Sequence, residues 1–465
     1  MQNRILVSET SAKIGEKITV AGWVHTRRDH GGLIFIDLRD RTGLLQIVFT
    51  GELASHDAAA LRAEWVVLVE GTIKKRPENM VNPDIPTGTI ELKAETLDII
   101  SEAATPPFPL DNDGYDINEE LRMEFRYLDL RRERMARNIR LRHKVTTLAR
   151  EYLNSQDFVE IETPLLTKTS PEGARDYLVP SRNQPGKFYA LPQAPQQYKQ
   201  LLMIAGFERY YQIARALRDE DPRGDRQPEH TQIDLEMSFV RERDVLDVVE
   251  GMMIHITQGV GKKILEKPFP VLSHKEAMEK YGDDKFDLRP EPKDSDTLAF
   301  AWVVDFPLLE KDQKTGGYTF VHNPFSAPHE EDLEKLLGQK ELETVRARQY
   351  DLVCNGFEVA SGGVRISDPQ VQRKVFEIMG LSTDEAEDRF GHLLRAYEFG
   401  APPHAGIAPG LDRLVMILAN EPNIREVIAF PKTGDGRDPM MQAPSEASAE
   451  QLRELGIEIK KKKDV

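Results

Sequence analysis

Four segments of the 465-residue chain gather arginines, carboxylates, glycines and prolines at spacings that could build a reaction site. They span residues 158–182, 210–239, 351–366 and 400–413. Guanidinium groups bind carboxylates and phosphates, and aspartate or glutamate oxygens bind hard cations, so these residue types suit anionic substrates. Each segment taken alone also has an ordinary explanation, because an arginine two residues before a glutamate is most often a surface ion pair.

The familiar nucleotide-binding and hydrolase motifs are missing from the chain. There is no G-x-x-x-x-G-K-[ST] loop and no G-x-G-x-x-G after a strand, which argues against a P-loop and a dinucleotide fold. H-E-x-x-H and G-x-S-x-G are missing as well. A nucleotide would therefore be bound with another geometry.

The elements that must position these segments begin with β-strands. Strands are expected at residues 17–25, 33–38, 44–49, 65–75 and 88–101, with a hairpin turn at 40–43. Five short strands in about 100 residues favour a small barrel of the oligonucleotide-binding (OB) type.

The pleat of this barrel points two polar or aromatic side chains outward. If the aliphatic rows that begin at Ile34 and Leu45 form the core, Phe35 and Gln46 face solvent, near Arg28 and His30. An outward aromatic ring beside an amide can stack on one base and read another. The ordinary alternative is a partly covered surface aromatic.

A proline-rich stretch at residues 103–113 reads as a linker, and a basic stretch follows it. Residues 122–150 hold nine arginines and one lysine against three acids, largely at helical spacing. We interpret this stretch as a local basic surface, although a solvated helix face is the usual explanation of a charge run.

The rest of the chain mixes helices and strands, which predicts an α+β domain with an antiparallel sheet. Strands are expected at 210–217 and 233–239, and helices at 141–153, 371–379, 384–397 and 411–418. In the second strand, Ile233, Leu235, Met237 and Phe239 share a core face, and Gln232, Asp234, Glu236 and Ser238 share a ligand face. The predicted organisation is a barrel at 1–104, a linker at 105–135, a catalytic domain at 136–445 and a C-terminal extension at 446–465.

Composition limits the classes of protein that remain. The formal net charge of −16 argues against a non-specific nucleic-acid coat, although it does not exclude a local basic surface. With Cys354 as the one cysteine, an intrachain disulfide and a multi-cysteine zinc site are excluded. No apolar run approaches the roughly 20 residues of a membrane span, and the first residues lack a signal core, so we expect a cytoplasmic protein.

Jointly, the four segments resemble the three signature motifs of class II aminoacyl-tRNA synthetases, in the family's order. Pro164 is the centre of the first motif, Arg218 and Glu220 form the Arg-x-Glu of the second, and Gly-Leu-Asp-Arg at 410–413 begins the third. The stretches SPEGARDYLVPSR (170–182), DRQPEHTQIDLEMSF (225–239) and HNPFSAP (322–328) are similar to bacterial-type aspartyl-tRNA synthetases. AGWVHTRRD and FIDLRD, within 21–40, are similar to the anticodon-binding barrel of these enzymes.

The resemblance implies activation of aspartate by ATP, followed by transfer to tRNA(Asp). Both reactants are anionic, so cations must neutralise and align them. The catalytic set implied is Arg218 between the amino-acid carboxylate and the α-phosphate, Arg413 at the γ-phosphate, and Glu220 at the adenine or amino side. The other ATP contacts implied are Asp219, Gln227, His230, Glu358, Gly410, Leu411 and Asp412.

Aspartate recognition is assigned by the same resemblance. Arg365 would clamp the side-chain carboxylate, Lys199 would add a charge, and Asp234 would orient Lys199 or take the ammonium. Glu172, in a lid-like Ser-Pro-Glu-Gly sequence, completes the set with Gln196, His322 and Arg218. Asparagine would leave the cationic donors unpaired, and sites of this kind discriminate about 10⁴-fold.

Further implied partners are a metal ion, a second subunit and the tRNA anticodon. Asp351 and Glu358 offer the hard oxygen ligands that Mg²⁺ requires. A homodimer through the first motif is expected. Phe35 and Gln46, with Arg28 and His30, match the anticodon readers, and a histidine at this place resembles members that charge both tRNA(Asp) and tRNA(Asn).

The chain departs from the family pattern at three places. About eighty residues separate Phe239 from His322, too few for the domain that bacterial-type members carry there. His230 replaces a phenylalanine that stacks on adenine, which leads us to expect weaker, pH-sensitive ATP binding. Ala360 and Ser361 interrupt a glycine-rich run and could crowd the ATP.

Three alternatives are weighed against the aspartyl assignment. An asparaginyl or lysyl relative is disfavoured by Lys199 together with Arg365. A non-catalytic RNA-binding paralogue is disfavoured because the charged motif residues are all present. A tRNA-free enzyme that makes a small amide from aspartate would need neither Phe35 nor Gln46.

Overall fold

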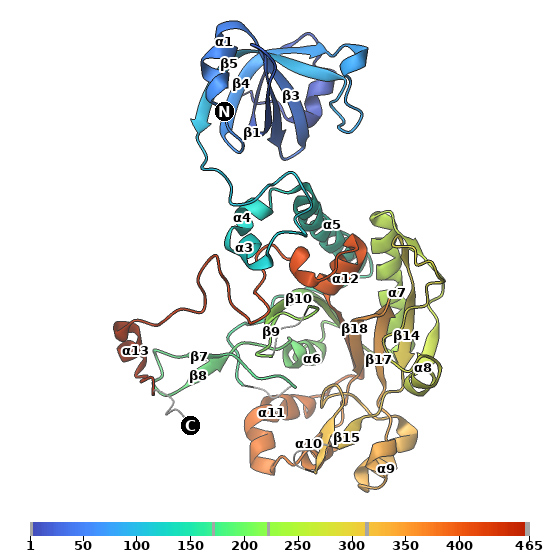
Figure 1. Ribbon diagram of the computed structural model, residues 1–465. Coiled ribbons are helices and arrows are strands. Elements are labelled where there is room, and N and C mark those ends of the chain that lie inside the picture. Colours follow the sequence, from blue (N-terminus) through green and yellow to red (C-terminus); the bar gives the residue numbers. More distant parts are fainter. Residues whose placement is uncertain (1–2, 170–172, 221–223, 312–315, 461–465) are drawn as a thin grey trace. The chain divides into compact units, whose positions relative to one another are not determined.

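The computed structural model describes residues 3–169, 173–220, 224–311 and 316–460. The chain divides into two compact units, Met1–Asn118 and Glu119–Val465 (Figure 1). The boundary between them lies inside the range 105–135 that the sequence predicted as a linker. Helices α3 (Glu119–Glu124) and α4 (Arg126–Asp129) belong to the second unit.

The first unit contains the predicted five-stranded barrel. The strands close in the order β1-β2-β3-β5-β4, and their bounds are β1 Lys17–Asp29, β2 Ile34–Asp40, β3 Gly43–Phe49, β4 Val66–Lys75 and β5 Ile90–Ser101. Asp40 pairs with Gly43 across the predicted turn. Short helices lie at η1 Val7–Ala12, α1 Gly51–Ser55, α2 Asp57–Ala60 and η2 Glu78–Met80.

The predicted pleat of the barrel is confirmed. The alternate residues of β2 and β3 that start at Ile34 and Leu45 are buried in one apolar cluster. Phe35 and Gln46 lie on the outer face and are half-buried. The alternation of side chains along a strand therefore predicted both positions correctly. It is a strong signal because a register slip of one residue would move the whole apolar row from the core to the surface.

The second unit is built on an eight-stranded sheet in the order β12-β14-β17-β18-β19-β10-β9-β6. The sheet is antiparallel except for the β12–β14 and β6–β9 pairings, which are parallel. The bounds are β6 Val159–Glu160, β9 Arg209–Leu217, β10 Glu229–Ser238, β12 Val271–Ser273, β14 Phe300–Val304, β17 Gln349–Cys354, β18 Phe357–Val364 and β19 His404–Pro409. Smaller two-stranded sheets pair β7 Leu178–Pro180 with β8 Phe188–Ala190, β11 Lys263–Ile264 with β13 Thr297–Leu298, and β15 Leu309–Lys311 with β16 Tyr318–Phe320.

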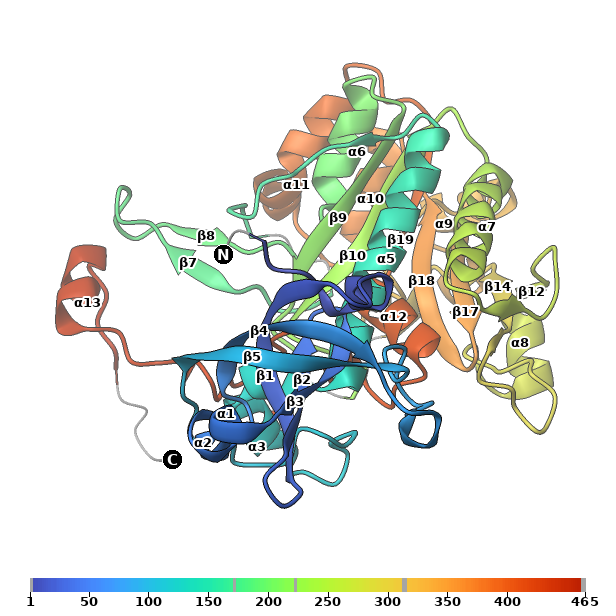
Figure 2. The same ribbon diagram turned by 90° about the horizontal axis from the view of Figure 1, so that it is seen from above.

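Helices cover both faces of the large sheet (Figure 2). Helices α5 (Glu133–Ser155), α7 (Glu242–Gly259) and α12 (Leu411–Ala419) pack on one face around a single apolar core. Helix α6 (Gln196–Ile204) packs against β9 and β10, with α11 (Thr383–Tyr397) and α10 (Pro369–Ile378) beyond it. The remaining helices are α8 His274–Tyr281, α9 Leu333–Leu337, α13 Ala449–Leu455, η3 Glu330–Asp332, η4 Leu342–Thr344 and η5 Ile424–Glu426.

The two faces of β10 follow the predicted pleat up to its last residue. Ile233, Leu235 and Met237 are buried in the core under the helices. Phe239 departs from the prediction, because β10 ends at Ser238 and Phe239 adopts a left-handed backbone (φ 58°) with its side chain 68% exposed.

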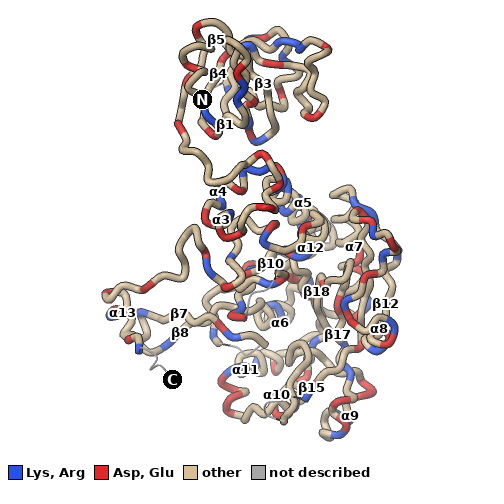
Figure 3. The backbone as a smooth tube through the Cα atoms, in the orientation of Figure 1, with Lys and Arg blue, Asp and Glu red and all other residues tan. Residues whose placement is uncertain are grey.

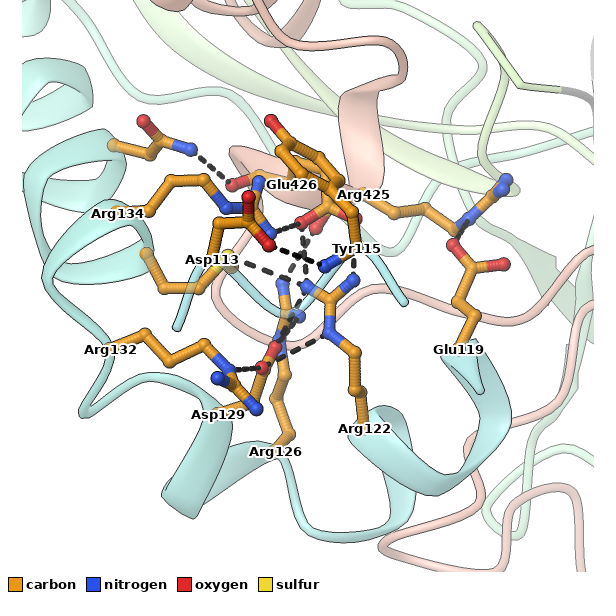
Figure 4. Close-up of polar contacts among 12 residues, drawn as sticks. Asp113, Tyr115, Glu119, Arg122, Arg126, Asp129, Arg132, Arg134, Arg425 and Glu426 are labelled. Atoms are coloured by element: carbon orange, nitrogen blue, oxygen red, sulfur yellow. Dashed lines mark hydrogen bonds and ion pairs between the residues drawn. The ribbon is translucent and has the colours of Figure 1, made fainter. Parts of the chain in front are cut away.

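The interpretation of residues 122–150 as a basic surface is wrong for its first half. Acidic and basic residues are interleaved along the chain (Figure 3), and four of the arginines in this stretch lie buried among carboxylates. Arg122 and Arg134 bind Glu426, and Asp129 accepts from the other two, Arg126 and Arg132 (Figure 4). Buried guanidinium groups must be paired, and here the acids neutralise them. In the part of the chain that is described, no helix has the length and apolarity to cross a bilayer.

Candidate active site

A cavity of about 870 Å³ opens in the second unit, on the face of β10 opposite the α5–α7–α12 core. Residues from β10, β18, β19, α6 and the start of α12 line it, together with Arg218 just beyond β9. It brings together most of the predicted site, namely Gln196, Lys199, Arg218, Glu220, Gln227, His230, Asp234, His322, Glu358, Arg365, Gly410, Asp412 and Arg413. Segments that are 200 residues apart in sequence therefore meet at one surface.

Four charged side chains form a buried group at one end of the cavity. The Lys199 ammonium lies 2.8 Å from Asp234 Oδ1 and 3.1 Å from Glu236 Oε2. Arg365 grips the same glutamate with two parallel hydrogen bonds, from Nε to Oε1 at 2.9 Å and from Nη2 to Oε2 at 3.1 Å. Two cations and two carboxylates balance in charge, which is the condition for burying them.

Burial and ion pairing act in opposite directions on this group. Burial alone raises the pKa of Glu236, but the Arg365 and Lys199 cations outweigh it and lower the pKa to about 2. Burial raises the pKa of Asp234, and the Lys199 ammonium opposes that effect. Glu236 is thus a fixed anion that holds both cations at the cavity wall.

Sequence reasoning missed the role of Glu236. The alternation of β10 had placed Glu236 on the ligand face, and this was the signal that could have identified it. No partner was predicted for its carboxylate. Gly406 makes room for it, because a Cβ at this glycine would lie 1.8 Å from Glu236 Oε2. The carboxylate therefore sits against bare backbone of the neighbouring strand β19.

The other end of the cavity carries the predicted ATP contacts. Arg413 donates from Nη2 to Asp225 Oδ2 at 3.0 Å and from Nη1 to the Glu358 carbonyl. Arg218, just beyond β9, donates to the Gln193 carbonyl at 3.3 Å. These two guanidinium groups stand on different elements around one space, as neutralisation of a polyphosphate requires.

Some predicted ATP contacts have other partners in the structure. Asp412 accepts a hydrogen bond from the Thr231 backbone at 2.8 Å and another from Arg142, so it ties α12 to β10 and α5. Leu411 is buried in the apolar core and does not line the cavity. Asp219 lies 3.6 Å from Arg175 Nε and is also outside the lining set. Glu172 falls outside the described residues.

The predicted metal ligands form an acidic pair beside His322. Asp351 Oδ2 lies 3.2 Å from His322 Nε2, and Glu358 Oε2 lies 3.4 Å from Lys285 Nζ. Burial and then the nearby Asp351 carboxylate raise the pKa of Glu358, and the Arg413 and Lys285 cations oppose that effect. Burial lowers the pKa of His322, but the surrounding carboxylates outweigh it and the net shift is upward.

A divalent cation fits this acidic pair. Across the described residues, no cluster of three or more metal-ligating side chains occurs, so Asp351 and Glu358 are the two carboxylates that could hold an ion here. Mg²⁺ commonly takes one or two carboxylates and completes its shell with water and phosphate oxygens. The donors therefore suit an ion that arrives with a nucleotide.

His230 lies in the cavity as a neutral ring. Burial and the nearby arginines, Arg218 first among them, lower its pKa to about 3. At pH 6 only on the order of one ring in a thousand is protonated. A pKa this low does not support the expectation of pH-sensitive ATP binding through this residue, because it favours a neutral imidazole near pH 7.

This leads to a prediction for the pH dependence of ATP binding. Between pH 5.5 and 8, we expect the KM for ATP to follow the same pH profile in the wild type and in His230→Phe, whatever their absolute values. ATP–pyrophosphate exchange at a series of pH values measures this. A wild-type profile that weakens below pH 6.5 while the variant stays flat would show that His230 titrates.

Comparison with known proteins gives consistent matches. The family model described as "tRNA synthetases class II (D, K and N)" matches residues 118–434, and an OB-fold nucleic acid binding model matches residues 18–100. An "Aspartate--tRNA(Asp/Asn) ligase" from Rubrobacter xylanophilus is 45% identical and covers 97% of this chain and 95% of its own. A protein with the same name from Caldanaerobacter subterraneus is 44% identical, with 96% of each chain covered.

A solved structure shares the fold. An asparaginyl-tRNA synthetase from Pyrococcus horikoshii, complexed with asparaginyl-adenylate, superposes with a TM-score of 0.76 over 93% of this chain and 99% of its own, at 22% identity. The alignment with the Rubrobacter protein runs over 575 positions, although this chain has 465 residues. At least 110 of these positions therefore have no counterpart here, as expected for a chain that lacks an inserted domain.

Proposed function

The chain belongs to the class II tRNA synthetases of the D, K and N group, and on that premise we propose that it is an ATP-dependent aspartate–tRNA ligase that charges both tRNA(Asp) and tRNA(Asn). The observation that carries the choice of amino acid is the buried group of Lys199, Asp234, Glu236 and Arg365. Glu236 takes two of the five N–H groups of Arg365, so the others can bind a second carboxylate. Asp234 offers an anion for the substrate ammonium.

The first reaction step needs alignment of two anions more than it needs a nucleophilic side chain. Arg218 would neutralise the aspartate α-carboxylate and the α-phosphate, and Arg413 would hold the far end of the triphosphate. Asp351 and Glu358 would hold Mg²⁺, which supplies charge neutralisation to the phosphates when it is bound. In this arrangement the protein orients the carboxylate oxygen for in-line displacement of pyrophosphate.

The amino-acid assignment is tested by exchange of pyrophosphate into ATP without tRNA. We expect exchange with aspartate, and a kcat/KM for asparagine lower by about 10⁴-fold, because its amide would face cationic donors that it cannot satisfy. Preference for asparagine or lysine would overturn the assignment in favour of a related synthetase. Exchange with aspartate but no charging of any tRNA would favour the tRNA-free amide-forming alternative.

The outer face of the barrel carries the observations that support tRNA binding. On its outer face, the rings of His30 and Phe35 meet edge to face, with centroids 5.6 Å apart. Gln46 donates to Glu91 at 2.8 Å and accepts from Arg28 at 3.2 Å. An aromatic edge, an amide and a cation on one surface suit unstacked bases and a phosphate backbone.

Phe35→Ala is expected to weaken tRNA charging and leave aspartate activation unchanged. Loss of one stacked base costs about 1–3 kcal/mol, so the KM for tRNA should rise roughly 5- to 150-fold. Aminoacylation and pyrophosphate exchange measured on the same preparation separate the two steps. Equal losses in both would show that Phe35 acts on the fold of the chain and not on the tRNA.

Three further features of the proposal concern breadth, assembly and location. His30 beside Phe35 supports acceptance of tRNA(Asn), and relatives that are 41–45% identical carry names with both tRNAs.

The edge strand β6 and the segment after it expose Val159, Leu165 and Leu166 to 45%, 49% and 52%. Apolar side chains beside an open sheet edge support a homodimer through this segment, which sedimentation analysis tests. The single cysteine is buried, which fits a cytoplasmic setting.

A further inference from the structure

The buried ion network of Figure 4 holds one arginine that binds backbone rather than only carboxylates. Arg126 donates to three main-chain carbonyls, from Nε to Ala429 at 2.9 Å and from Nη2 to Arg425 at 2.6 Å and to Ile428 at 2.8 Å. Its Nη1 donates to Asp129 Oδ2 at 2.7 Å. One rigid side chain from α4 thus fixes the backbone that follows α12.

The backbone held by Arg126 continues to the ATP end of the cavity. We call residues 424–432 the wall segment. At its start, the Ile424 amide donates to the Gly224 carbonyl at 3.2 Å. At its end, the Lys432 amide donates to Gln227 Oε1 at 2.7 Å, and Gln227 Nε2 donates back to the Lys432 carbonyl at 3.1 Å. Ile424 and Gln227 both line the cavity.

We propose that Arg126 is a positioning residue for ATP: it holds the wall segment, and the wall segment holds Gln227 and the loop around it. The two ends of the segment are pinned to residues 224–227 and its middle is pinned to Arg126. The inference rests on the proposed function, because it gives Arg126 a role in the part of the cavity that is proposed to bind ATP.

The chemistry of the guanidinium explains why an arginine stands here. A planar fork with five N–H groups can serve three carbonyls and a carboxylate at fixed angles, whereas a lysine offers three donors at one point. Buried carbonyls that lose their donors must find others or move toward water. Loss of Arg126 therefore frees the backbone in the middle of the wall segment. When this backbone moves, the Gln227 side chain that is hydrogen-bonded to Lys432 moves with it.

Asp129 offsets part of the positive charge around Arg126. Its two oxygens accept from Arg122, Arg126 and Arg132, and Glu426 shares Arg122 with it. Burial lowers the pKa of Arg126, and the Asp129 carboxylate opposes that effect. Arg126→Lys keeps a cation beside Asp129 and removes the fork, so it is the variant that isolates positioning from charge.

The test is ATP–pyrophosphate exchange with ATP and aspartate titrated separately. For Arg126→Lys we expect the KM for ATP to rise about tenfold and the KM for aspartate to stay within about twofold of the wild type. Arg126→Gln, which keeps a partial donor without the charge, should also raise the KM for ATP and leave the KM for aspartate within about twofold of the wild type, and it serves if the lysine variant folds poorly. Calorimetric binding of ATP with Mg²⁺ should show the same loss of affinity.

The matched control is Leu153→Ala, which removes a fully buried side chain of α5 from the core. It should lower the melting temperature and leave both KM values unchanged. The inference is overturned if Arg126→Lys leaves the KM for ATP unchanged, or if both KM values rise together. If the wild type shows no exchange with aspartate, the proposed function fails, and calorimetry of ATP binding still decides whether Arg126 positions the nucleotide.

Discussion

Arg365→Leu is expected to abolish aspartate activation, with pyrophosphate exchange falling by at least about 10³-fold. Two effects act in the same direction. The substrate side-chain carboxylate loses its bidentate partner, and Glu236 is left as a buried anion with Lys199 as its remaining cation. Exchange measured over a wide range of aspartate concentrations distinguishes lost catalysis from weaker binding.

The stability of this variant must be controlled, because removing one partner of a buried ion pair costs about 3–5 kcal/mol. The double variant Arg365→Leu/Glu236→Gln removes both charges and leaves Lys199 paired with Asp234. We expect its melting temperature to recover toward that of the wild type while exchange stays lost. Near-normal exchange in either variant would remove Arg365 from aspartate recognition.

Arg218→Gln is expected to reduce kcat for activation by at least about 10³-fold and to change the KM for aspartate much less. In the proposed site, Arg218 would meet the reactants where negative charge is concentrated, so its contribution would grow as the carboxylate oxygen approaches phosphorus. Single-turnover formation of the adenylate measures this step directly.

Arg215→Gln is the matched control for Arg218, because both arginines belong to the β9 region. Arg215 pairs with Glu229, has a side chain that is 44% exposed and does not line the cavity. We expect it to keep exchange within about threefold of the wild type, as for a surface ion pair. A comparable loss in both variants would assign the effect to the strand and not to Arg218.

Much of the fold could be predicted from the sequence because it depends on local alternation. The barrel strands, the turn at Asp40 and the two faces of β10 all follow from a period of two residues, which the backbone imposes on any strand. The same rule failed at Phe239, where the chain leaves the sheet in a left-handed conformation. Local pattern carries no signal for the residue at which pairing ends.

The sequence predicted which residues belong to the site, but it did not predict the contacts among them. Motif residues could be placed at one cavity, but Glu236 had no assigned partner, and the hydrogen bonds of Asp412 with the Thr231 backbone and Arg142 were not predicted. Such contacts are set by packing, and no spacing rule reports them.

The arginine-rich stretch shows the same limit more strongly. One of the two acids that bind Arg122, Glu426, lies 304 residues away in the chain. A run of charges therefore gives the composition of a segment without telling whether its partners are solvent, nucleic acid or another part of the protein. Burial places the first half of this stretch in the interior of the protein and not on its surface.

The most direct measurement is aminoacylation with radiolabelled aspartate on purified tRNA(Asp) and tRNA(Asn) transcripts in parallel. We predict that both tRNAs are charged, with kcat/KM values within about 150-fold of each other, since a single base contact contributes only about 1–3 kcal/mol. Charging of tRNA(Asp) alone would contradict the proposed breadth. Charging of neither, with exchange intact, would contradict the central claim that this chain transfers aspartate to tRNA.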